Sequence, residues 1–178
     1  MLPTPAHVWA AHSHAQAQVL AVTGEIGAGK TTWCRALIAH VRELGLRVAG
    51  VSAPGVFADG HKVAIDLLDL ASNEQRRLAE RLAVMDAASP TPNWKFYAET
   101  LAWGDRVLKA IDACDLLVID ELGPLELRHN QGWQQALPLL KQGRYRLACV
   151  VVRRSLLTAF QAIFAEAQVI EIARKHTH

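Results

Sequence analysis

Short apolar runs alternate along the chain with longer segments in which apolar residues recur three and four positions apart. Five runs predict buried strands: Val19–Thr23, Arg47–Ala53, Asp115–Asp120, Arg146–Val152 and Gln168–Ala173. Four segments predict helices: Thr31–Leu44, Leu101–Ala113, Trp133–Lys141 and Leu156–Glu166. Because strands and helices alternate, we expect an α/β fold with a largely parallel sheet that helices cover on both faces.

The stretch between residues 55 and 92 has a different pattern. Ala58, Asp59 and Gly60 form a turn signal and Lys62–Leu70 partly alternates, so we expect a hairpin that adds antiparallel strands at one edge. Residues 71–85 fit either a short amphipathic helix or a returning strand. We therefore predict one domain over residues 18–178, with residues 55–92 as an edge excursion, after a loosely ordered lead-in over residues 1–17.

Composition and charge limit the number of domains, the partners and the cellular location that we expect. A chain of 178 residues with a net charge of +2 suits one domain and does not indicate nucleic acid or a membrane surface as a partner. The three cysteines, Cys34, Cys114 and Cys149, are widely spaced, which favours reduced thiols. Neither a signal peptide nor a run of membrane-spanning length is recognisable, so we expect a cytoplasmic protein. The sequence leaves its oligomeric state open.

The first predicted strand runs directly into a glycine-rich turn that opens a helix. Nine residues form the predicted phosphate-binding loop: Gly24, Glu25, Ile26, Gly27, Ala28, Gly29, Lys30, Thr31 and Thr32. Glycines allow the backbone to approach a phosphate closely, and the N–H groups that begin the helix face the same anion. Lys30 suits the β- and γ-phosphates, and the Thr31 hydroxyl suits Mg²⁺. Strand, loop and helix in this order favour a nucleoside triphosphate site over an empty turn.

A pair of acids follows a later apolar strand. Asp120 and Glu121 come directly after four apolar residues, and the carboxyl ends of parallel strands meet in the crevice that holds the phosphate loop. Asp120 is therefore a candidate for holding Mg²⁺ through water, and Glu121 for orienting or deprotonating an attacking water. A solvated pair of acids is the alternative interpretation.

Two arginines follow the strand Arg146–Val152 and are expected near the same crevice. A cation placed against the transferring phosphoryl group contributes roughly 10³–10⁵ in rate. The alternative is that Arg153, Arg154 or both face solvent. The candidate catalytic residues are therefore Lys30, Glu121, Arg153 and Arg154.

These motifs favour hydrolysis but leave two alternatives open. A nucleotide or small-molecule kinase needs an acceptor pocket and usually an arginine-bearing lid, for which Arg76, Arg77 and Arg81 are candidates. A cluster of this kind on an exposed surface is more often a solvated face. A nucleotide-gated binding module would instead use the surface of residues 55–95 to dock a partner.

Four segments, GEIGAGKTT, VAGVSAP, KVAIDLLDL and VIDELGPLEL, together resemble the small P-loop nucleoside-triphosphatases of thermophiles, which are also named cancer-related NTPases. The segment Asp120–Leu127 matches the family pattern D-E-[I/L]-G-x-[M/L]-E-L. The resemblance covers about Val19 to Ile172 and implies a RecA-like core. It also implies slow, Mg²⁺-dependent hydrolysis of nucleoside triphosphates to diphosphate and phosphate, with broad base specificity.

By position, the resemblance implies a role for each matching residue. Asp120 would support Mg²⁺ and Glu121 would act on water. Phosphates and metal would be held by Gly24, Gly27, Gly29, Lys30, Thr31 and Thr32. Asn93–Phe96 and Ala173–His176 depart from the family pattern, so base contacts or partner surfaces can differ there.

Overall fold

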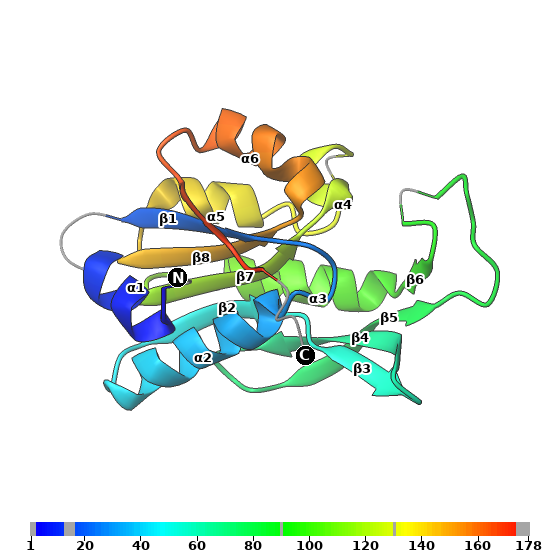
Figure 1. Ribbon diagram of the computed structural model, residues 1–178, viewed down its shortest axis with the longest axis horizontal. Coiled ribbons are helices and arrows are strands. Elements are labelled where there is room, and N and C mark those ends of the chain that lie inside the picture. Colours follow the sequence, from blue (N-terminus) through cyan, green and yellow to red (C-terminus); the bar gives the residue numbers. More distant parts are fainter. Residues whose placement is uncertain (1–2, 13–16, 90, 130, 174–178) are drawn as a thin grey trace.

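The computed structural model describes residues 3–12, 17–89, 91–129 and 131–173. Within these residues a nine-stranded sheet runs through the molecule, and helices cover both of its faces (Figure 1). The sheet has a parallel part and an antiparallel part, which meet between β2 and β4. The predicted α/β class, with a hairpin excursion at one edge, is confirmed.

The parallel part contains the apolar runs that the sequence predicts as strands. Its order is β2 (Val48–Ser52), β7 (Leu116–Leu122), β8 (Leu147–Val152), β1 (Gln18–Thr23) and β9 (Gln168–Glu171). Every residue of β2 and β8 is buried, because these strands are covered on both faces. β8 separates β1 from β7, so the segments that follow these two strands emerge at one edge of the sheet, two strand positions apart.

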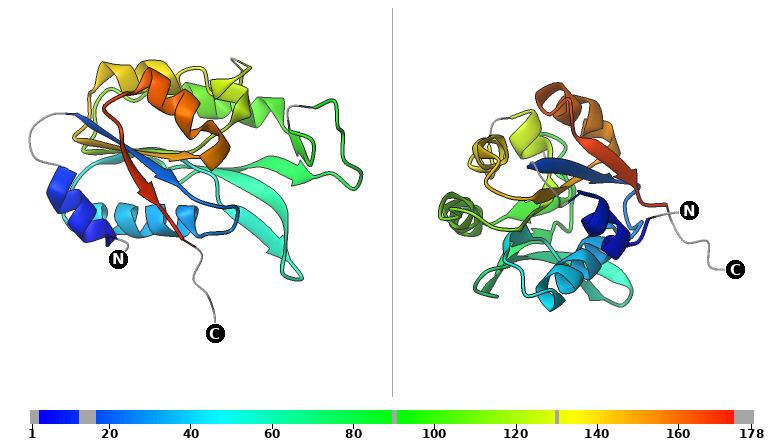
Figure 2. Two further views of the ribbon diagram at one scale, coloured as in Figure 1. Left: turned by 45° about the horizontal axis from the view of Figure 1, so that its top comes forward. Right: turned by 90° about the vertical axis from the view of Figure 1, so that its left-hand side faces the viewer.

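Helices pack on both faces of this sheet (Figure 2). One face carries α1 (Pro5–His12) and α2 (Lys30–Glu43). The other carries α3 (Ala98–Lys109), α5 (Ala136–Gln142) and α6 (Leu157–Ile163). Two short segments, α4 (Pro124–Leu127) and the 3₁₀ turn η1 (Arg154–Leu156), follow β7 and β8 directly. Each face encloses its own cluster of buried apolar side chains, so the sheet divides the core in two.

The lead-in differs from the expectation of loose order, because Pro5–His12 forms a helix. Its Val8 and Trp9 are buried in the same apolar cluster as Leu37 of α2. Trp33 adds a bond by donating Nε1–H to the carbonyl oxygen of Pro3 at 3.3 Å. Packing on α2 therefore stabilises a helix too short to form alone. Residues 1, 2 and 13–16 of the lead-in lie outside the described residues.

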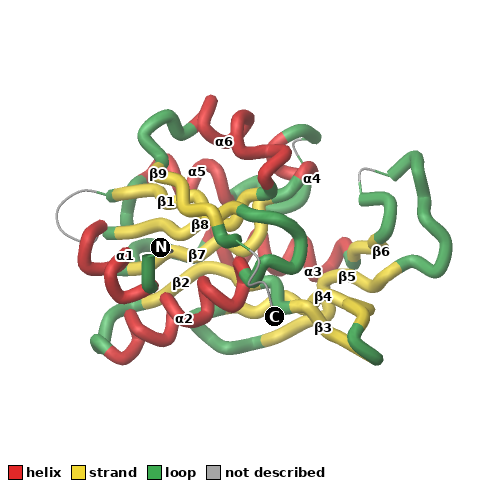
Figure 3. The backbone as a smooth tube through the Cα atoms, in the orientation of Figure 1, coloured by secondary structure: helices red, strands yellow, loops and turns green. Residues whose placement is uncertain are grey.

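The antiparallel part is built from β3 (Gly55–Ala58), β4 (His61–Asp69), β5 (Gln75–Arg81) and β6 (Trp94–Phe96). It continues the parallel part as one curved sheet (Figure 3). The predicted hairpin is confirmed, with Asp59 and Gly60 at positive φ in its turn. The ambiguity over residues 71–85 is resolved in favour of a strand, because β5 pairs with both β4 and β6.

The three cysteines carry free thiols. Cys34 and Cys149 are buried in the cluster beneath α2, and Cys114 is half-buried. Across the described ranges, no helix combines the length and apolar character that crossing a membrane requires.

Candidate active site

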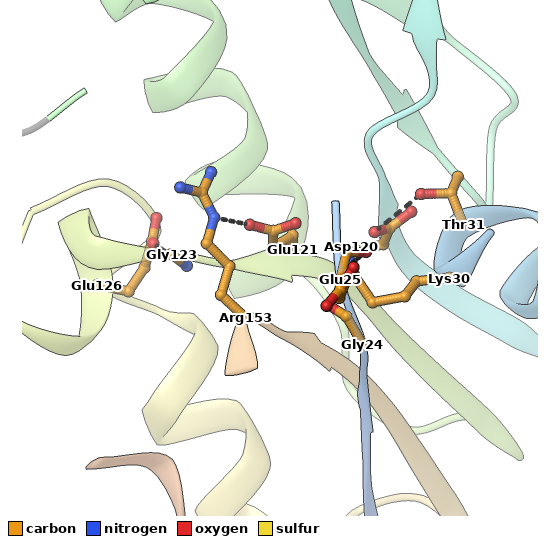
Figure 4. A network of polar contacts seen from close by, with 9 residues as sticks. All are labelled: Gly24, Glu25, Lys30, Thr31, Asp120, Glu121, Gly123, Glu126 and Arg153. Atoms are coloured by element: carbon orange, nitrogen blue, oxygen red, sulfur yellow. Dashed lines mark hydrogen bonds and ion pairs between the residues drawn. The ribbon is translucent and has the colours of Figure 1, made fainter. Parts of the chain in front are cut away.

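The predicted phosphate-binding loop connects β1 to α2, and its lysine folds back over it. The buried Lys30 donates Nζ–H to the carbonyl oxygens of Gly24 at 3.0 Å and Glu25 at 2.8 Å (Figure 4). Both contacts are to neutral acceptors, so the charge of the ammonium is not cancelled by them. An anion that enters the loop would meet a cation already positioned inside it.

The backbone of this loop requires glycine at its two ends. Gly24 has φ +144°, and a Cβ there would lie 2.4 Å from the carbonyl oxygen of Ile172. Gly29 precedes α2 with φ +95°, a left-handed conformation that favours glycine. The N–H groups that begin α2 have no acceptors within the helix, so they are available to a ligand in the loop.

Asp120 lies beside the phosphate loop, held by two hydroxyl groups. Thr31 Oγ1 donates to its Oδ1 at 3.4 Å, and Ser52 Oγ donates to its Oδ2 at 3.2 Å. The side chain is 2% exposed. Burial, and then the charge of Glu121, raise the pKa of Asp120 to about 6, while the two hydroxyl groups lower it. A bound cation would remove the cost of ionising this buried carboxyl.

These residues fit Mg²⁺ in their chemistry. Mg²⁺ prefers oxygen ligands and is usually bound by one or two carboxylates together with substrate phosphates and water. Thr31 and Asp120 offer a hydroxyl and a carboxylate oxygen next to the phosphate loop. In the described ranges, no three His, Cys, Asp or Glu side chains gather as a self-sufficient metal cage. A metal ion that binds together with a nucleotide does not need such a cage, because the phosphates provide some of its ligands.

Glu121 contacts one of the two candidate arginines. The β7–β8 ladder shifts register between Ile119 and Leu122, so the two acids depart from regular pairing at the strand end. Glu121 Oε1 accepts from Arg153 Nε, and the two side chains are 28% and 47% exposed. Arg153 directly follows β8, the neighbour of β7. The structure therefore brings this acid and this cation together at the solvent-facing side of the site (Figure 4).

Arg154 takes a different direction from its neighbour. Its guanidinium pairs with Glu171, near the end of β9. The 3₁₀ turn η1 begins at Arg154, which separates the directions of the two consecutive side chains. Arg154 and the acid pair of β7 are thus not brought into contact.

Sequence reasoning missed two residues that support the acids. Ser52 holds Asp120, and its signal was a polar residue at the end of an apolar strand. Glu126 fixes the segment after Glu121 by accepting from the N–H groups of Gly123 at 2.9 Å and Trp133 at 3.1 Å. Its signal was a glutamate three residues after Gly123, the residue that caps a short helix. The final glutamate of the DELGPLEL segment is thus a backbone anchor.

The arginines considered for a kinase lid are tied to the antiparallel part. Arg77 pairs with Asp66 at 2.5 Å, and Arg76 lies over the ring of Trp103 at 4.5 Å. Arg81 ends the same strand, β5, which β4 and β2 separate from β7. Their contacts are those of a structural surface.

A glycine-rich loop between strand and helix, a buried lysine inside it and an acid beside its threonine define a P-loop nucleotide-binding protein. Within that class, the profile of the family described as NTPase matches residues 19–176. The chain therefore belongs to the NTPase family.

Curated relatives carry the name nucleoside-triphosphatase THEP1. The Ignicoccus hospitalis protein is 32% identical over 129 residues, covering 72% of this chain and 67% of its own length. The Thermococcus kodakarensis protein is 30% identical over 149 residues, covering 80% and 79%. The Methanopyrus kandleri protein is 27% identical over 111 residues, and the match spans only 59% of that protein.

Two solved structures share the fold. A human cancer-related nucleoside triphosphatase in solution superposes with a TM-score of 0.68 at 17% identity, over 89% of this chain and 90% of that one. Crystalline THEP1 from Aquifex aeolicus gives a TM-score of 0.60 at 17% identity, over 88% and 90%. These similarities confirm the predicted P-loop fold.

Proposed function

We propose that this protein hydrolyses nucleoside 5′-triphosphates to diphosphate and phosphate, with Mg²⁺ and with broad base specificity. The contact between Thr31 and Asp120 carries the proposal, because it joins the phosphate loop to the acid-bearing strand. The names of the curated relatives support a nucleoside triphosphate as the substrate. The free thiols fit a reducing cytoplasm as the location.

The loop and the metal residues would bind the substrate. The backbone N–H groups of residues 24–32 would hold the phosphates, with the Lys30 ammonium turning from two carbonyl oxygens to the β- and γ-phosphates. Thr31 and Asp120 would hold Mg²⁺, which neutralises charge on these phosphates when bound. The hydrogen bonds that Thr31 and Ser52 donate to Asp120 support this assignment, because they hold its carboxyl group beside the loop.

Glu121 would act on the water. Its carboxylate orients a water against the γ-phosphorus and accepts a proton as the water oxygen attacks. Arg153 contacts this carboxylate and can either orient it or turn its guanidinium to the γ-phosphate. Because both side chains are partly exposed, either arrangement is accessible to a ligand that enters from solvent.

Phosphate release from ATP, GTP, CTP and UTP with Mg²⁺ tests this function. We expect the wild-type protein to release phosphate from all four, and Glu121→Gln to be slower by roughly 10²–10⁴ while still binding nucleotide. Glu43→Gln, at the exposed far end of α2, is the matched control and should turn over normally. A wild-type protein that binds all four nucleotides and hydrolyses none would contradict the proposal.

A further inference from the structure

Lys62 lies on the hairpin that follows β2, and its side chain runs back along the hairpin. It pairs with Phe57 in the β3–β4 ladder. A Cβ built on Gly55, two residues nearer to β2, would lie 2.7 Å from Cε of Lys62 and 3.3 Å from its Cδ. The lysine stem therefore covers Gly55, at the base of the hairpin and away from its turn.

The base of the hairpin adjoins the candidate active site. Ser52 ends β2 and donates to Asp120 Oδ2 at 3.2 Å, and β3 begins three residues later at Gly55. The side chain that covers Gly55 is thus connected to the metal-holding acid through one short segment of backbone.

The charges that act on Lys62 belong to the active site. Burial lowers the pKa of its ammonium. The negative charges of Glu121 and Asp120 raise this pKa in turn, in that order. The positive charges of Arg153 and Lys30 lower it. The four charges that act on the ammonium are thus those of the candidate site, which adjoins the base of the hairpin.

Within the described part of the chain, Lys62 has no carboxylate within 4.0 Å, and its contact is with the face of Trp94, 5.6 Å from the ring centroid. The other cations of the site are engaged, Lys30 with two carbonyl oxygens and Arg153 with Glu121. A half-buried ammonium without an anionic partner is costly unless a ligand provides one.

We propose that Lys62 is a catalytic residue, whose ammonium binds the γ-phosphate and stabilises the negative charge that develops there during hydrolysis. This inference rests on the proposed function and adds a cation to it. The water oxygen bonds to the γ-phosphorus, the bond from phosphorus to the β–γ bridging oxygen breaks, and its electron pair stays on the diphosphate. The water proton goes to Glu121, while Lys62 keeps its protons throughout.

Turnover of ATP with Mg²⁺ by Lys62→Met gives the first test. Removing one positioned donor to developing charge should lower kcat by roughly 10²–10³. Lys62→Arg keeps the charge and should retain most of the activity. Lys95→Met is the matched control, because Lys95 lies over the ring of Tyr97 at 6.0 Å in the same part of the sheet. A wild-type kcat in Lys62→Met would overturn the proposal.

Nucleotide affinity separates this proposal from the proposed function, because it needs no turnover. Lys62→Met should bind a non-hydrolysable triphosphate at least about tenfold more weakly and a diphosphate with unchanged affinity. The wild-type protein could hydrolyse no nucleotide while Lys62→Met still weakens only triphosphate binding. That result would contradict the hydrolase function and support the contact between Lys62 and the γ-phosphate. Equal losses for both nucleotides would contradict a contact with the γ-phosphate.

Gly55→Ala provides a variant that keeps the lysine. The added Cβ would displace the Lys62 stem without removing its charge, and Gly55 has no positive φ that would strain alanine. We expect a smaller fall in kcat, about three- to tenfold, and no further fall when Gly55→Ala is added to Lys62→Met. Additive losses in the double variant would mean that Gly55 does not act through Lys62.

Discussion

Buried charged side chains have different partners in the two parts of the sheet. In the parallel part, the buried charges Lys30 and Asp120 contact carbonyl and hydroxyl groups. In the antiparallel part, the buried Asp66 is paired with Arg77. Neutral partners satisfy hydrogen bonds but leave a charge uncompensated, whereas an ion pair compensates it.

This difference in the partners of buried charges indicates where a charged ligand would bind. A triphosphate with its metal brings both signs of charge, and the parallel part holds an uncompensated cation and an uncompensated acid at one edge. Lys62 of the antiparallel part also has no carboxylate partner in the described ranges, and the base of its hairpin adjoins that same edge. Substitutions at the phosphate-binding edge of the parallel part should therefore change ligand binding, and most of those in the antiparallel part only stability.

The largest effect on nucleotide affinity is expected at Gly24. Alanine there would be strained at φ +144° and would bring Cβ within 2.4 Å of a backbone oxygen of Ile172, so the loop or β9 must move. We expect Gly24→Ala to lose diphosphate affinity by more than about 100-fold and to be destabilised by roughly 3 kcal/mol. Isothermal titration and urea unfolding measure the two effects.

Gly60→Ala is the control in the antiparallel part. Gly60 also has a positive φ, +76°, but an added Cβ would meet no atom within 4 Å. Its alanine variant should cost about 1 kcal/mol and leave diphosphate affinity unchanged. If both alanine variants lost affinity to a similar extent, the proposed difference between the two parts would be wrong.

Asp120→Asn should separate function from stability. The pKa of this carboxyl is about 6 in the folded protein, above its ordinary value near 4, so the folded state holds the proton more tightly than the unfolded state. Stability of the metal-free protein therefore falls as the pH rises from 4 to 6. Asparagine avoids this loss, so the variant should be more stable than the wild type at pH 7.5 by roughly 2 kcal/mol.

Urea unfolding in EDTA at pH 4 and pH 7.5 tests this sign. The measurements at pH 4 serve as the control, because both side chains are then neutral in the folded protein. Hydrolysis with Mg²⁺ should nevertheless be lower by roughly 100-fold or more in Asp120→Asn, since one metal ligand is weakened. A variant less stable than the wild type at pH 7.5, by the same amount as at pH 4, would show that ionisation of Asp120 costs nothing.

The elements that sequence predicts well are those that local pattern determines. Val19–Thr23 and Leu116–Ile119 are apolar because both faces of a parallel strand are covered, so the pattern alone locates them and the motifs that follow. Local pattern does not predict helix α1, because only Val8 and Trp9 of its eight residues are buried. The burial of both side chains depends on packing against α2.

The missed residues of the site depend on pairing between distant segments. Ser52 and Asp120 are 68 positions apart and meet because β2 pairs with β7. Lys62 is oriented by a hairpin whose register shifts between Val56 and Phe57, which no local signal in the sequence reveals. Arg153 and Arg154 are adjacent in sequence, yet a turn sends them to β7 and β9 respectively.

The smallest effects are expected from two ion pairs away from the phosphate loop, one of them in the antiparallel part. Arg77 is 43% exposed and Asp66 12% exposed, so solvent screens the pair and Arg77→Met should cost only about 1 kcal/mol, most of it from leaving Asp66 without its cation. Arg144→Met, which breaks the more exposed pair with Asp112, should cost less than about 0.5 kcal/mol. Urea unfolding measures both, and kcat should be unchanged in each, because neither arginine belongs to the phosphate-binding edge. A substantial loss of kcat in Arg77→Met at normal stability would mean that β5 takes part in the reaction, and the division of roles between the two parts of the sheet would have to be abandoned.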